Sequence, residues 1–579
     1  MKGALLVAGT SSDAGKSVVV AGICRLLARS SVTVAPFKAQ NMSLNSVVTP
    51  DGAEIGRAQA AQAAAARIAP EAAMNPVLLK PGGEVSSQVV VMGRPLGEAD
   101  ACSYQELRGE LGPVVVRALE SLRSRFDVVI CEGAGSLAEF NLREGDLANM
   151  GLARAARLPV VVVSDIDRGG ALASLFGSVA VLDPDDQALV GAFLLNKFRG
   201  DKALLDPGID RLAALTGRPI LGVLPWSGGL WLDAEDSVAL AGPRDSSFMS
   251  TGGDTLSVAV VRLPRISNFT DFDALSTEPG VVVSFTDSPA DVQRADLVVL
   301  PGTKATVEDL AWLRARGLAE AVRDRAGRGL PILGICGGYQ MLGKRIADAV
   351  ESGAGELEGL DLLPVETAFA ADKILSNRVG TATAFGGVPV SGYEIRHGRI
   401  TRFGGDSVIE TPAGEEGCRV GGVVGISWHA ALESDAYRRA LLQWVGELRG
   451  TDWAPGSHSF AQLREERLDR VGDLIASHVD IDALVGLLEE GAPHGLPVLE
   501  TRLFKRETTI EDDLEDRASA DLLVHGDRMV HPGQIDFAVN VVPGGPPPWL
   551  RFELASALTR ASTYPDEWNA LGALAERHG

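Results

Sequence analysis

Short, uninterrupted apolar runs recur along the first part of the chain, separated by glycine-rich or polar segments. The runs are Gly3–Ala8, Asp127–Cys131, Pro159–Ser164 and Val190–Leu195. Runs of this length without polar alternation are typical of parallel strands that are buried on both faces. Two segments with helical character, Val18–Ala28 and the alanine-rich Ala58–Arg67, lie between the first two runs. Strands that alternate with helices predict an α/β domain built on a parallel sheet.

The same alternation starts again in the middle of the chain. Its apolar runs are Leu256–Val261, Ala295–Leu300, Leu330–Ile335 and Val423–Ser427. They predict a second α/β domain of roughly 200 residues. The stretch Ala241–Asp254, which contains proline, glycine and serine, is the predicted linker between the two domains. Residues Phe460–Leu488 are amphipathic and are expected to form a helical tail of the second domain.

The length of the chain, 579 residues, exceeds what one hydrophobic core usually accommodates, so about three domains are expected. We expect domains over residues 1–240 and 255–450, a helical tail over 451–490 and an extension over 491–579. The extension is set apart because prolines and a charged run follow Gly491, with a further proline-rich stretch at Pro543–Pro548.

Composition excludes several classes of function. Hydrophobic residues make up 46% and charged residues 22% of the chain, as in ordinary soluble proteins. The net charge of −22 argues against binding to nucleic acid or to an anionic membrane. No signal peptide and no membrane span are expected, and five scattered cysteines without a CxxC pair fit a reducing cytoplasm. No pattern in the sequence indicates an oligomeric state.

A glycine-lysine loop follows the first apolar run, with the sequence Gly9-Thr10-Ser11-Ser12-Asp13-Ala14-Gly15-Lys16-Ser17. Such a loop between a strand and a helix wraps backbone N–H groups around phosphate oxygens. Lys16 would reach the outer phosphates of ATP and Ser17 would bind Mg²⁺. The other predicted nucleotide contacts are Gly9, Thr10, Asp13 and Gly15. Five residues separate the two glycines, in place of the usual four.

Polar residues follow the later strands of the first domain. Glu132 begins the sequence Glu132-Gly133-Ala134-Gly135-Ser136 and is a candidate metal ligand beside the triphosphate. Asn196 could place its amide against the nucleotide base. Simpler readings remain open: a glycine turn with an exposed glutamate, and polar caps at Asn196, Asp165 and Asp167.

In the second domain, Cys336 stands in the glycine-tight sequence Gly334-Ile335-Cys336-Gly337-Gly338, directly after a predicted strand. This context predicts a sharp strand-to-helix turn that presents a nucleophile. A thiol needs a base, and His429 follows another strand of the same domain. The turn Leu300-Pro301-Gly302-Thr303-Lys304 could donate N–H groups to an oxyanion. The alternative for Cys336 is a buried, inert cysteine.

Together the phosphate loop and the thiol turn indicate an enzyme that activates an acceptor with ATP and takes ammonia from glutamine. Further strings narrow this down: Pro36–Ser43, Glu132–Ser136, Asn141–Asp146, Ile266–Asp273 and Gly392–Ile395. With these strings, residues 1–490 resemble the cobyric acid synthases, the glutamine-hydrolysing amidases of cobalamin synthesis. The first domain is also similar to dethiobiotin synthetase, which shares the loop spacing.

The resemblance implies a P-loop, dethiobiotin-synthetase-like parallel-sheet domain followed by a class I glutamine amidotransferase-like, flavodoxin-like α/β domain. It implies amidation of the b, d, e and g carboxylates of adenosyl-cobyrinic acid a,c-diamide, with glutamine, ATP and Mg²⁺. Cys336 matches the family's nucleophile, His429 its partner histidine, and Asp146 a position tied to the amidation site.

Two positions differ from the family pattern near the thiol. Gly-Tyr-Glu-Ile is followed by Arg396, with His397 one place later, where the family usually has histidine directly. The usual Tyr-Leu-His-Gly is replaced by Ser427-Trp428-His429-Ala430. These differences predict an altered glutamine pocket around an intact nucleophile and base.

The extension resembles the opening of a threonine-phosphate decarboxylase, a pyridoxal-phosphate enzyme of the same pathway. The strings that carry this resemblance are His525–Asp527, Asp536–Asn540 and Tyr564–Asp566. The chain stops before such a fold could supply its cofactor-binding lysine, so no pyridoxal phosphate is expected. The competing interpretation is an arm that packs on a partner.

Two other functions remain to be separated from the first. One is a cobyrinic acid a,c-diamide synthase, which shares the chemistry of both domains. The other is a ParA-like ATPase switch, which would use the phosphate loop and leave Cys336 and His429 without a role.

Overall fold

The computed structural model describes residues 1–83, 86–228 and 254–499. Residues Met1–Thr501 form one compact unit. All of the predicted linker except Asp254, and nearly all of the predicted extension, lie outside the described residues, so the decarboxylase resemblance is not tested by the structure. No described helix is long and apolar enough to cross a membrane.

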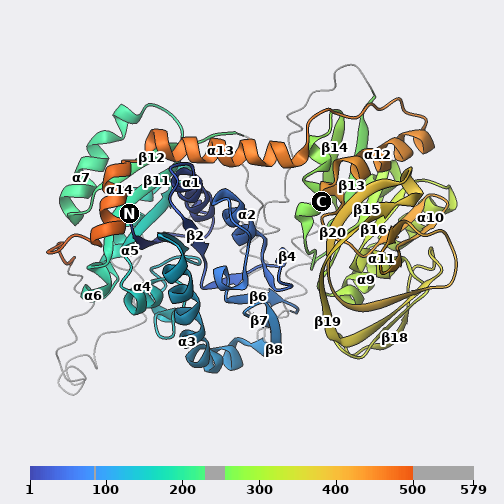
Figure 1. The fold of residues 1–579 in the computed structure, drawn as a ribbon, viewed down its shortest axis with the longest axis horizontal. Helices are drawn as coiled ribbons and strands as arrows, with labels where there is room; N and C mark the ends of the chain where they lie inside the picture. Colours follow the sequence, from blue (N-terminus) through green and yellow to red (C-terminus); the bar gives the residue numbers. More distant parts are fainter. Residues whose placement is uncertain (84–85, 229–253, 500–579) are drawn as a thin grey trace, which may run out of the picture. The chain divides into compact units, whose positions relative to one another are not determined.

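The first domain is built on a six-stranded sheet in which every neighbouring pair of strands is parallel (Figure 1). In spatial order its strands are β12 (Ile220–Pro225), β11 (Val190–Phe198), β10 (Val160–Asp165), β1 (Gly3–Gly9), β9 (Val128–Glu132) and β2 (Val34–Phe37). The predicted parallel sheet is therefore confirmed. Strands β2 and β12 were not expected from the sequence.

Both faces of this sheet are covered, which explains why its strands lack polar alternation. Successive residues of β1 point to opposite faces: Leu6 and Ala8 belong to one core, Leu5 and Val7 to another. The first core is closed mainly by α3 (Ala101–Arg125), α4 (Met150–Ala156), α5 (Ala171–Ala180) and α7 (Asp206–Thr216). The second is closed by α1 (Lys16–Arg29) and by two helices from the end of the described chain.

Smaller β elements extend the first domain. Strands β3 (Gln40–Met42), β6 (Val77–Pro81), β7 (Ser86–Val91) and β8 (Arg94–Asp100) form a four-stranded sheet. Strands β4 (Ser46–Val48) and β5 (Glu54–Gly56) form a hairpin that leads into α2 (Arg57–Ala65). The sequence did not predict these strands: β3, β4 and β5 have three residues each, and β8 is exposed at every position but one.

The second domain contains a six-stranded sheet that is parallel except for one edge strand. In order, its strands are β14 (Val281–Thr286), β13 (Leu256–Val261), β15 (Leu297–Leu300), β16 (Ile332–Ile335), β24 (Val423–Ile426) and the antiparallel β23 (Cys418–Val420). Its helices are α8 (Pro289–Arg294), α9 (Thr306–Ala315), α10 (Leu318–Gly327), α11 (Gly337–Leu342) and α12 (Asp435–Arg449). The predicted α/β class is confirmed for this domain too.

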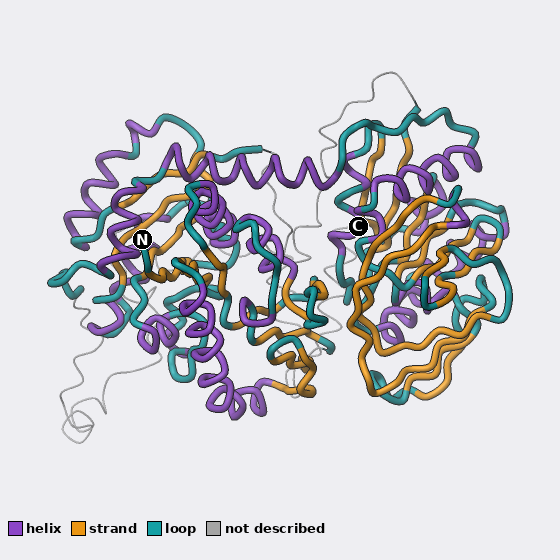
Figure 2. Tube along the Cα trace, in the orientation of Figure 1, coloured by secondary structure: helices purple, strands orange, loops and turns teal. Residues whose placement is uncertain are grey.

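A second sheet of this domain was not predicted. It is dominated by the long antiparallel pair β19 (Val365–Ala382) and β20 (Val388–Arg402), drawn as extended orange segments in Figure 2. Strands β17 (Arg345–Asp348), β18 (Gly355–Glu358), β21 (Ile409–Thr411) and β22 (Gly414–Glu416) complete it. Many residues of β19 are partly exposed, so the sheet has no continuous apolar run that marks it in the sequence.

The helical tail packs on the first domain, so its predicted place on the second domain was wrong. It consists of α13 (Phe460–His478) and α14 (Ile481–Glu490), which Val479 and Asp480 separate. The Asp480 side chain accepts a hydrogen bond from the Ala483 N–H at 3.0 Å. Leu468 and Ile475 belong to the core that includes α1, and Figure 1 shows α13 beside α1. An amphipathic pattern specifies which face of a helix is buried, but not which domain covers that face.

Shortening Ile475 to alanine is expected to lower the free energy of unfolding by about 2–5 kcal/mol, because the side chain is fully buried. Its Cγ1 already lies within 2.4 Å of where a Cβ on Gly22 would stand, so the two helices are in close contact. Urea unfolding monitored by circular dichroism measures the change. Glu466→Ala, on the exposed face of the same helix, is the control and should shift stability by about 0.5 kcal/mol or less. Equal effects of the two substitutions would contradict the packing.

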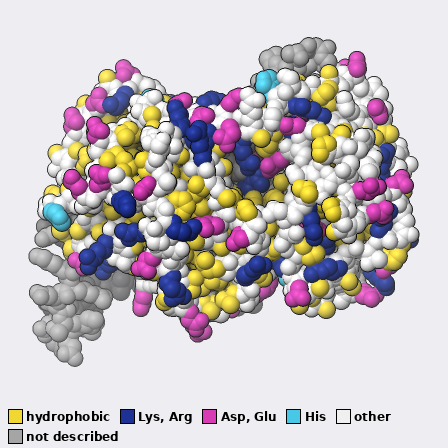
Figure 3. Space-filling view, in the orientation of Figure 1, with side chains coloured by type: hydrophobic (Ala, Val, Ile, Leu, Met, Phe, Trp, Pro, Cys, Tyr) yellow, Lys and Arg dark blue, Asp and Glu magenta, His cyan; other side chains and the backbone are white. Residues whose placement is uncertain are grey.

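Charged side chains of both signs are interspersed on the face of the molecule shown in Figure 3.

Candidate active sites

The predicted nucleotide loop encloses the side chain of Lys16, which is buried. Its ammonium donates to the Ser11 carbonyl at 2.9 Å and to the Gly135 carbonyl at 2.8 Å. Gly15 has φ 95°, in the left-handed region that favours glycine. A Cβ on Gly9 would come within 2.9 Å of the Lys16 Nζ atom. Both glycines therefore allow the backbone to close tightly around this ammonium.

Glu132, at the end of β9, is buried and surrounded by donors. Its Oε1 atom accepts from the Ser17 hydroxyl at 2.8 Å and from the Lys38 ammonium at 3.0 Å, while Oε2 accepts from the Gln62 amide. Burial alone would raise the pKa of Glu132, but the Lys38 ammonium and the two other hydrogen bonds hold it below its usual value. The structure thus brings the two predicted metal ligands together, with Glu132 as an ionised oxygen donor and Ser17 as a neutral one.

This pair fits a hard divalent cation whose remaining ligands are phosphate and water, as is usual for Mg²⁺. Within the described ranges no group of three or more His, Cys, Asp and Glu side chains could hold a metal ion by itself.

Asn196, at the end of β11, lies directly against the phosphate loop. Its amide donates to the Ala14 carbonyl at 3.0 Å, and a Cβ on Gly15 would come within 2.0 Å of the amide nitrogen. The neighbouring Lys197 donates to the Asp13 carbonyl at 2.7 Å and to Asp165 at 2.9 Å. Contact between Asn196 and a base stays a prediction.

Thr10 and Asp13 lie at the start and the middle of the same loop. The Thr10 hydroxyl is 3.0 Å from the Ser164 hydroxyl at the end of β10. The Asp13 carboxylate pairs with Arg168 at 2.8 Å. The predicted nucleotide residues therefore gather at the carboxyl edge of the parallel sheet, where ligands bind in open α/β sheets.

Cys336 occupies the turn between β16 and α11 in a strained backbone conformation, with φ 50° and ψ −106°. Such a conformation costs of order 1–3 kcal/mol and persists only where the surroundings enforce it. The glycines around it make the turn possible: a Cβ on Gly334 would lie 2.9 Å from the Tyr339 N atom, and one on Gly338 would lie 2.0 Å from the Leu300 carbonyl oxygen. This strained, glycine-flanked backbone is the geometry expected of the predicted strand-to-helix turn that presents a nucleophile.

His429 is paired with Asp271, a residue that sequence reasoning did not select. The His429 Nδ1 atom is 2.7 Å from Asp271 Oδ2, and the Ala430 N–H donates to Asp271 Oδ1 at 2.8 Å. Both side chains are 2% exposed. Asp271 lies in the string Ile266–Asp273. That string contributed to the family resemblance, but no role was predicted for Asp271 itself.

The surroundings of His429 favour its protonated form. Burial alone would lower the pKa of this imidazole, but the Asp271 carboxylate and the Cys336 sulfur outweigh burial and raise the pKa to about 10. A histidine that holds its proton beside a thiol can donate that proton to a leaving amine.

Asp271→Asn is expected to slow glutamine hydrolysis about 10²- to 10⁴-fold, because an amide stabilises an imidazolium poorly and does not fix its tautomer. The pKa of His429 is raised from 6.5 to about 10, so the stability it contributes is full below pH 6.5 and is lost as the pH rises through about 10. Urea unfolding across this range should show a smaller decline in the variant than in the parent protein. Asp287→Asn, at a 39% exposed carboxylate, should change neither quantity.

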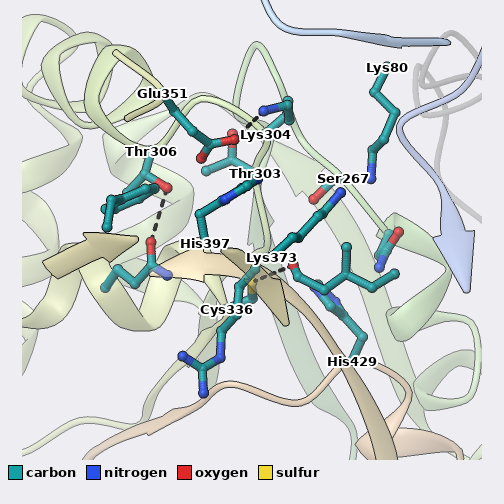
Figure 4. A pocket seen from close by; sticks show the side chains of 16 residues that line it. Lys80, Ser267, Thr303, Lys304, Thr306, Cys336, Glu351, Lys373, His397 and His429 are labelled. Carbon is teal, nitrogen blue, oxygen red and sulfur yellow. Dashed lines mark hydrogen bonds and ion pairs between the residues drawn. The ribbon is translucent and has the colours of Figure 1, made fainter. Parts of the chain in front are cut away.

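Cys336 and His429 line one pocket (Figure 4). The lining residues are Lys80, Ser267, Asn268, Thr303, Lys304, Thr306, Cys336, Gly337, Gln340, Glu351, Phe369, Lys373, Ile395, Arg396, His397 and His429. Most of them are polar or charged, as a site for a zwitterionic amino acid requires.

The predicted oxyanion turn after β15 lies beside this pair. A Cβ on Gly302 would come within 2.6 Å of His429 Cε1, and one on Gly337 within 3.1 Å of the Thr303 N atom. Gly337 is the first residue of α11, a position whose N–H has no partner within the helix. Backbone N–H groups are thus available next to the nucleophile.

Comparison with known proteins finds matches to both domains. A family model for the CobQ/CobB/MinD/ParA nucleotide binding domain matches residues 5–237, and one for the CobB/CobQ-like glutamine amidotransferase domain matches residues 257–437. Cobyric acid synthase of Frankia casuarinae is 57% identical over 517 residues, covering 86% of this chain and 99% of that protein. Cobyric acid synthase of Streptomyces avermitilis is 59% identical over 505 residues, with coverage of 86% and 99%.

The chain belongs to the cobyric acid synthase family. The predicted family, the fold class and the expectation of a glutamine-dependent amidotransferase are confirmed.

The first departure from the family pattern, at Arg396 and His397, lies at the pocket. Arg396 lines it and pairs with the buried Glu394 at 2.6 Å. His397 also lines it, and its Nδ1 atom lies 3.0 Å from the Ala370 carbonyl oxygen. Burial lowers the pKa of His397 and so favours its neutral imidazole. The permanent positive charge at this place in the pocket comes from Arg396.

Asp146 has a structural environment that the family match did not suggest. Its Oδ1 atom accepts from the Ala148 and Asn149 N–H groups and its Oδ2 atom from the Gly151 N–H, each at 2.9 Å. The carboxylate therefore shapes the turn that enters α4. A contact between Asp146 and substrate stays a prediction.

The other cysteines are unlike Cys336. Cys24 on α1 and Cys131 on β9 are fully buried, and burial raises the pKa of both thiols. Cys418 is buried and Cys102 is exposed. Thiols kept neutral in an apolar core are poor nucleophiles.

Proposed function

We propose that this protein catalyses the ATP- and glutamine-dependent amidation of the b, d, e and g carboxylates of adenosyl-cobyrinic acid a,c-diamide, which gives adenosyl-cobyric acid in cobalamin biosynthesis. The observation that carries the proposal is the extent of the match to relatives named cobyric acid synthase. A further relative, the cobyric acid synthase of Mycolicibacterium paratuberculosis, is 55% identical over 507 residues, and the match covers 100% of its length.

In the second domain, the Cys336 thiolate would attack the side-chain amide carbon of glutamine to form a tetrahedral intermediate. The Gly337 N–H and the Gly302–Thr303 turn would face its oxyanion. As the C–N bond breaks, His429 would protonate the leaving nitrogen, which departs as ammonia and leaves a thioester. His429, oriented by Asp271, would then remove a proton from the water that hydrolyses the thioester to glutamate.

In the first domain, a corrinoid carboxylate would attack the γ-phosphorus of ATP, so that ADP leaves and an acyl phosphate forms. Lys16 would stabilise the charge that develops on the phosphoryl oxygens. Mg²⁺, held by Ser17 and Glu132, would supply further charge neutralisation when bound. Ammonia would then attack the acyl carbon and displace phosphate, which leaves the amide.

Mass spectrometry of adenosyl-cobyrinic acid a,c-diamide incubated with the protein, ATP, Mg²⁺ and glutamine tests the proposal. Each acid-to-amide conversion exchanges a hydroxyl for an amino group, so four successive one-amide mass changes are expected. Cobyrinic acid, tested in parallel, should not be converted. Two amidations of cobyrinic acid would instead indicate the a,c-diamide synthase. Glutamate release measured in the same samples should depend on corrinoid and ATP, which an ATPase switch would not show.

A further inference from the structure

Helix α2 contacts residues of both candidate sites. At its first residue, Arg57 forms an ion pair with Glu433, and five residues later Gln62 donates to Glu132. Arg57, Gln62 and Glu132 are all buried. A five-residue separation corresponds to about 7.5 Å along a helix axis and about 140° around it. The two side chains therefore leave the helix in different directions.

At the first residue of α2, the Arg57 side chain contacts two segments that adjoin His429. Glu433 belongs to the short helical turn Ala431–Glu433 that follows His429. Arg57 also hydrogen-bonds the Tyr393 side chain. Tyr393 and His429 exchange two backbone hydrogen bonds of 3.0 and 2.9 Å, and their rings lie 5.7 Å apart. One guanidinium thus contacts the residues that fix the backbone of the catalytic histidine.

The hairpin before α2 contacts the Asp271 segment in the same way. The Ser46 N–H donates to Asn268 at 2.9 Å, and the Phe269 N–H donates to Asn45 at 3.0 Å. The Tyr393 hydroxyl donates to the Ser46 carbonyl at 3.0 Å. Both members of the His429–Asp271 pair are therefore supported by residues of the first domain.

The Gln62 end depends on the state of the nucleotide site. The Glu132 carboxylate that accepts from Gln62 is also the proposed cation ligand, so a bound cation competes with Gln62 for its oxygens. The Gln62 Oε1 atom is buried without a hydrogen-bond partner, so the hydrogen bond that Gln62 donates to Glu132 restrains this side chain. Between the two ends, α2 is mostly alanine, the residue with the highest helix propensity.

We propose that Arg57 is a positioning residue for the His429–Asp271 pair, and that α2 transmits the state of Glu132 to it through Gln62. Nucleotide bound to the first domain then changes the reactivity of Cys336 toward glutamine. The inference rests on the proposed function only in taking ATP as the ligand of the phosphate loop.

Labelling of Cys336 tests the connection without catalytic turnover. The probe is 6-diazo-5-oxo-L-norleucine, a glutamine analogue that alkylates such thiols, and intact-protein mass spectrometry follows its addition. With Mg²⁺ and a non-hydrolysable ATP analogue, the labelling rate of the parent protein should change at least threefold. Gln62→Met, which keeps the size of the side chain and removes the donor, should abolish the change and leave the nucleotide-free rate within twofold. A parent protein without any response, or a variant with the full response, overturns the connection.

Substitution of Arg57 tests the positioning role. Arg57→Met should lower kcat for glutamine hydrolysis at least tenfold and leave KM for glutamine within twofold, because the base moves while the pocket remains. Arg57→Lys should recover part of the loss, since it keeps a cation beside Glu433. Adding Glu433→Gln to Arg57→Met should cause little further loss, as expected for one shared interaction. Arg125→Met, which breaks an exposed ion pair with Glu71, is the matched control and should change neither value.

Ammonia-dependent amidation separates positioning from general damage. It should stay within twofold in Arg57→Met, and an equal loss of both activities overturns the positioning role. If the parent protein amidates no corrinoid with ammonia and ATP, the proposed function fails, whereas the labelling results still decide the present inference.

Discussion

Cys336→Ala is expected to abolish glutamine-dependent amidation, with a loss of about 10³-fold or more, and to leave ammonia-dependent amidation within about twofold. The alanine removes the atom that forms the thioester, and Cys336 is the one cysteine among the described residues with the strained turn and a histidine partner. Ammonia supplied as an ammonium salt at alkaline pH bypasses that step. Amide formation measured by mass spectrometry with each nitrogen source gives the two rates.

The control for this substitution is Cys102→Ala, at an exposed cysteine on α3, which should affect neither rate. Equal loss of both activities in Cys336→Ala would show that the two domains do not divide the work as proposed. Retention of glutamine-dependent activity would exclude Cys336 as the nucleophile.

Lys16→Met is expected to have the converse effect, with amidation reduced about 10²- to 10³-fold whichever nitrogen source is used. The Lys16 ammonium lies inside the loop, held by two backbone carbonyls, and methionine keeps most of its volume without its charge. ADP release measured with corrinoid and either nitrogen source reports the loss. Alkylation of Cys336 by the diazo analogue in the absence of nucleotide should continue.

Lys202→Met provides the matched control, since that lysine is 65% exposed on the same domain. A Lys16→Met protein that still releases ADP at the parental rate would place the phosphate site elsewhere.

Four parallel strands of each domain could be predicted because burial on both faces leaves few polar positions to interrupt them. Val160–Asp165 is buried at every position. Cys336 could be predicted for a related reason, because a nucleophile turn needs small residues at fixed places around it. In both cases the constraint acts over a few neighbouring residues and therefore leaves a local mark in the sequence.

Other features depend on residues that are distant in the chain. Asp271 gains its role from His429, 158 positions later, and nothing in its own neighbourhood requires a carboxylate for catalysis. Likewise, Arg57 directly precedes the predicted helix Ala58–Arg67 and meets Glu433 only in the folded protein. The position of α13 was predicted wrongly because either domain could have covered its apolar stripe.

The return of α13 and α14 to the first domain makes that domain discontinuous. Glu489 pairs with the amino group of Met1 at 3.4 Å, and the Asp480 N–H donates to the carbonyl of Leu221 in β12 at 2.7 Å. The amidotransferase domain is therefore an insertion between two parts of one folding unit. A chain shortened to residues 1–240 would expose the apolar surface of α1 that the final helices cover. Supplying residues 457–499 as a separate peptide should restore its solubility, so the boundary of the ATP-binding module is spatial and does not coincide with a single cut in the sequence.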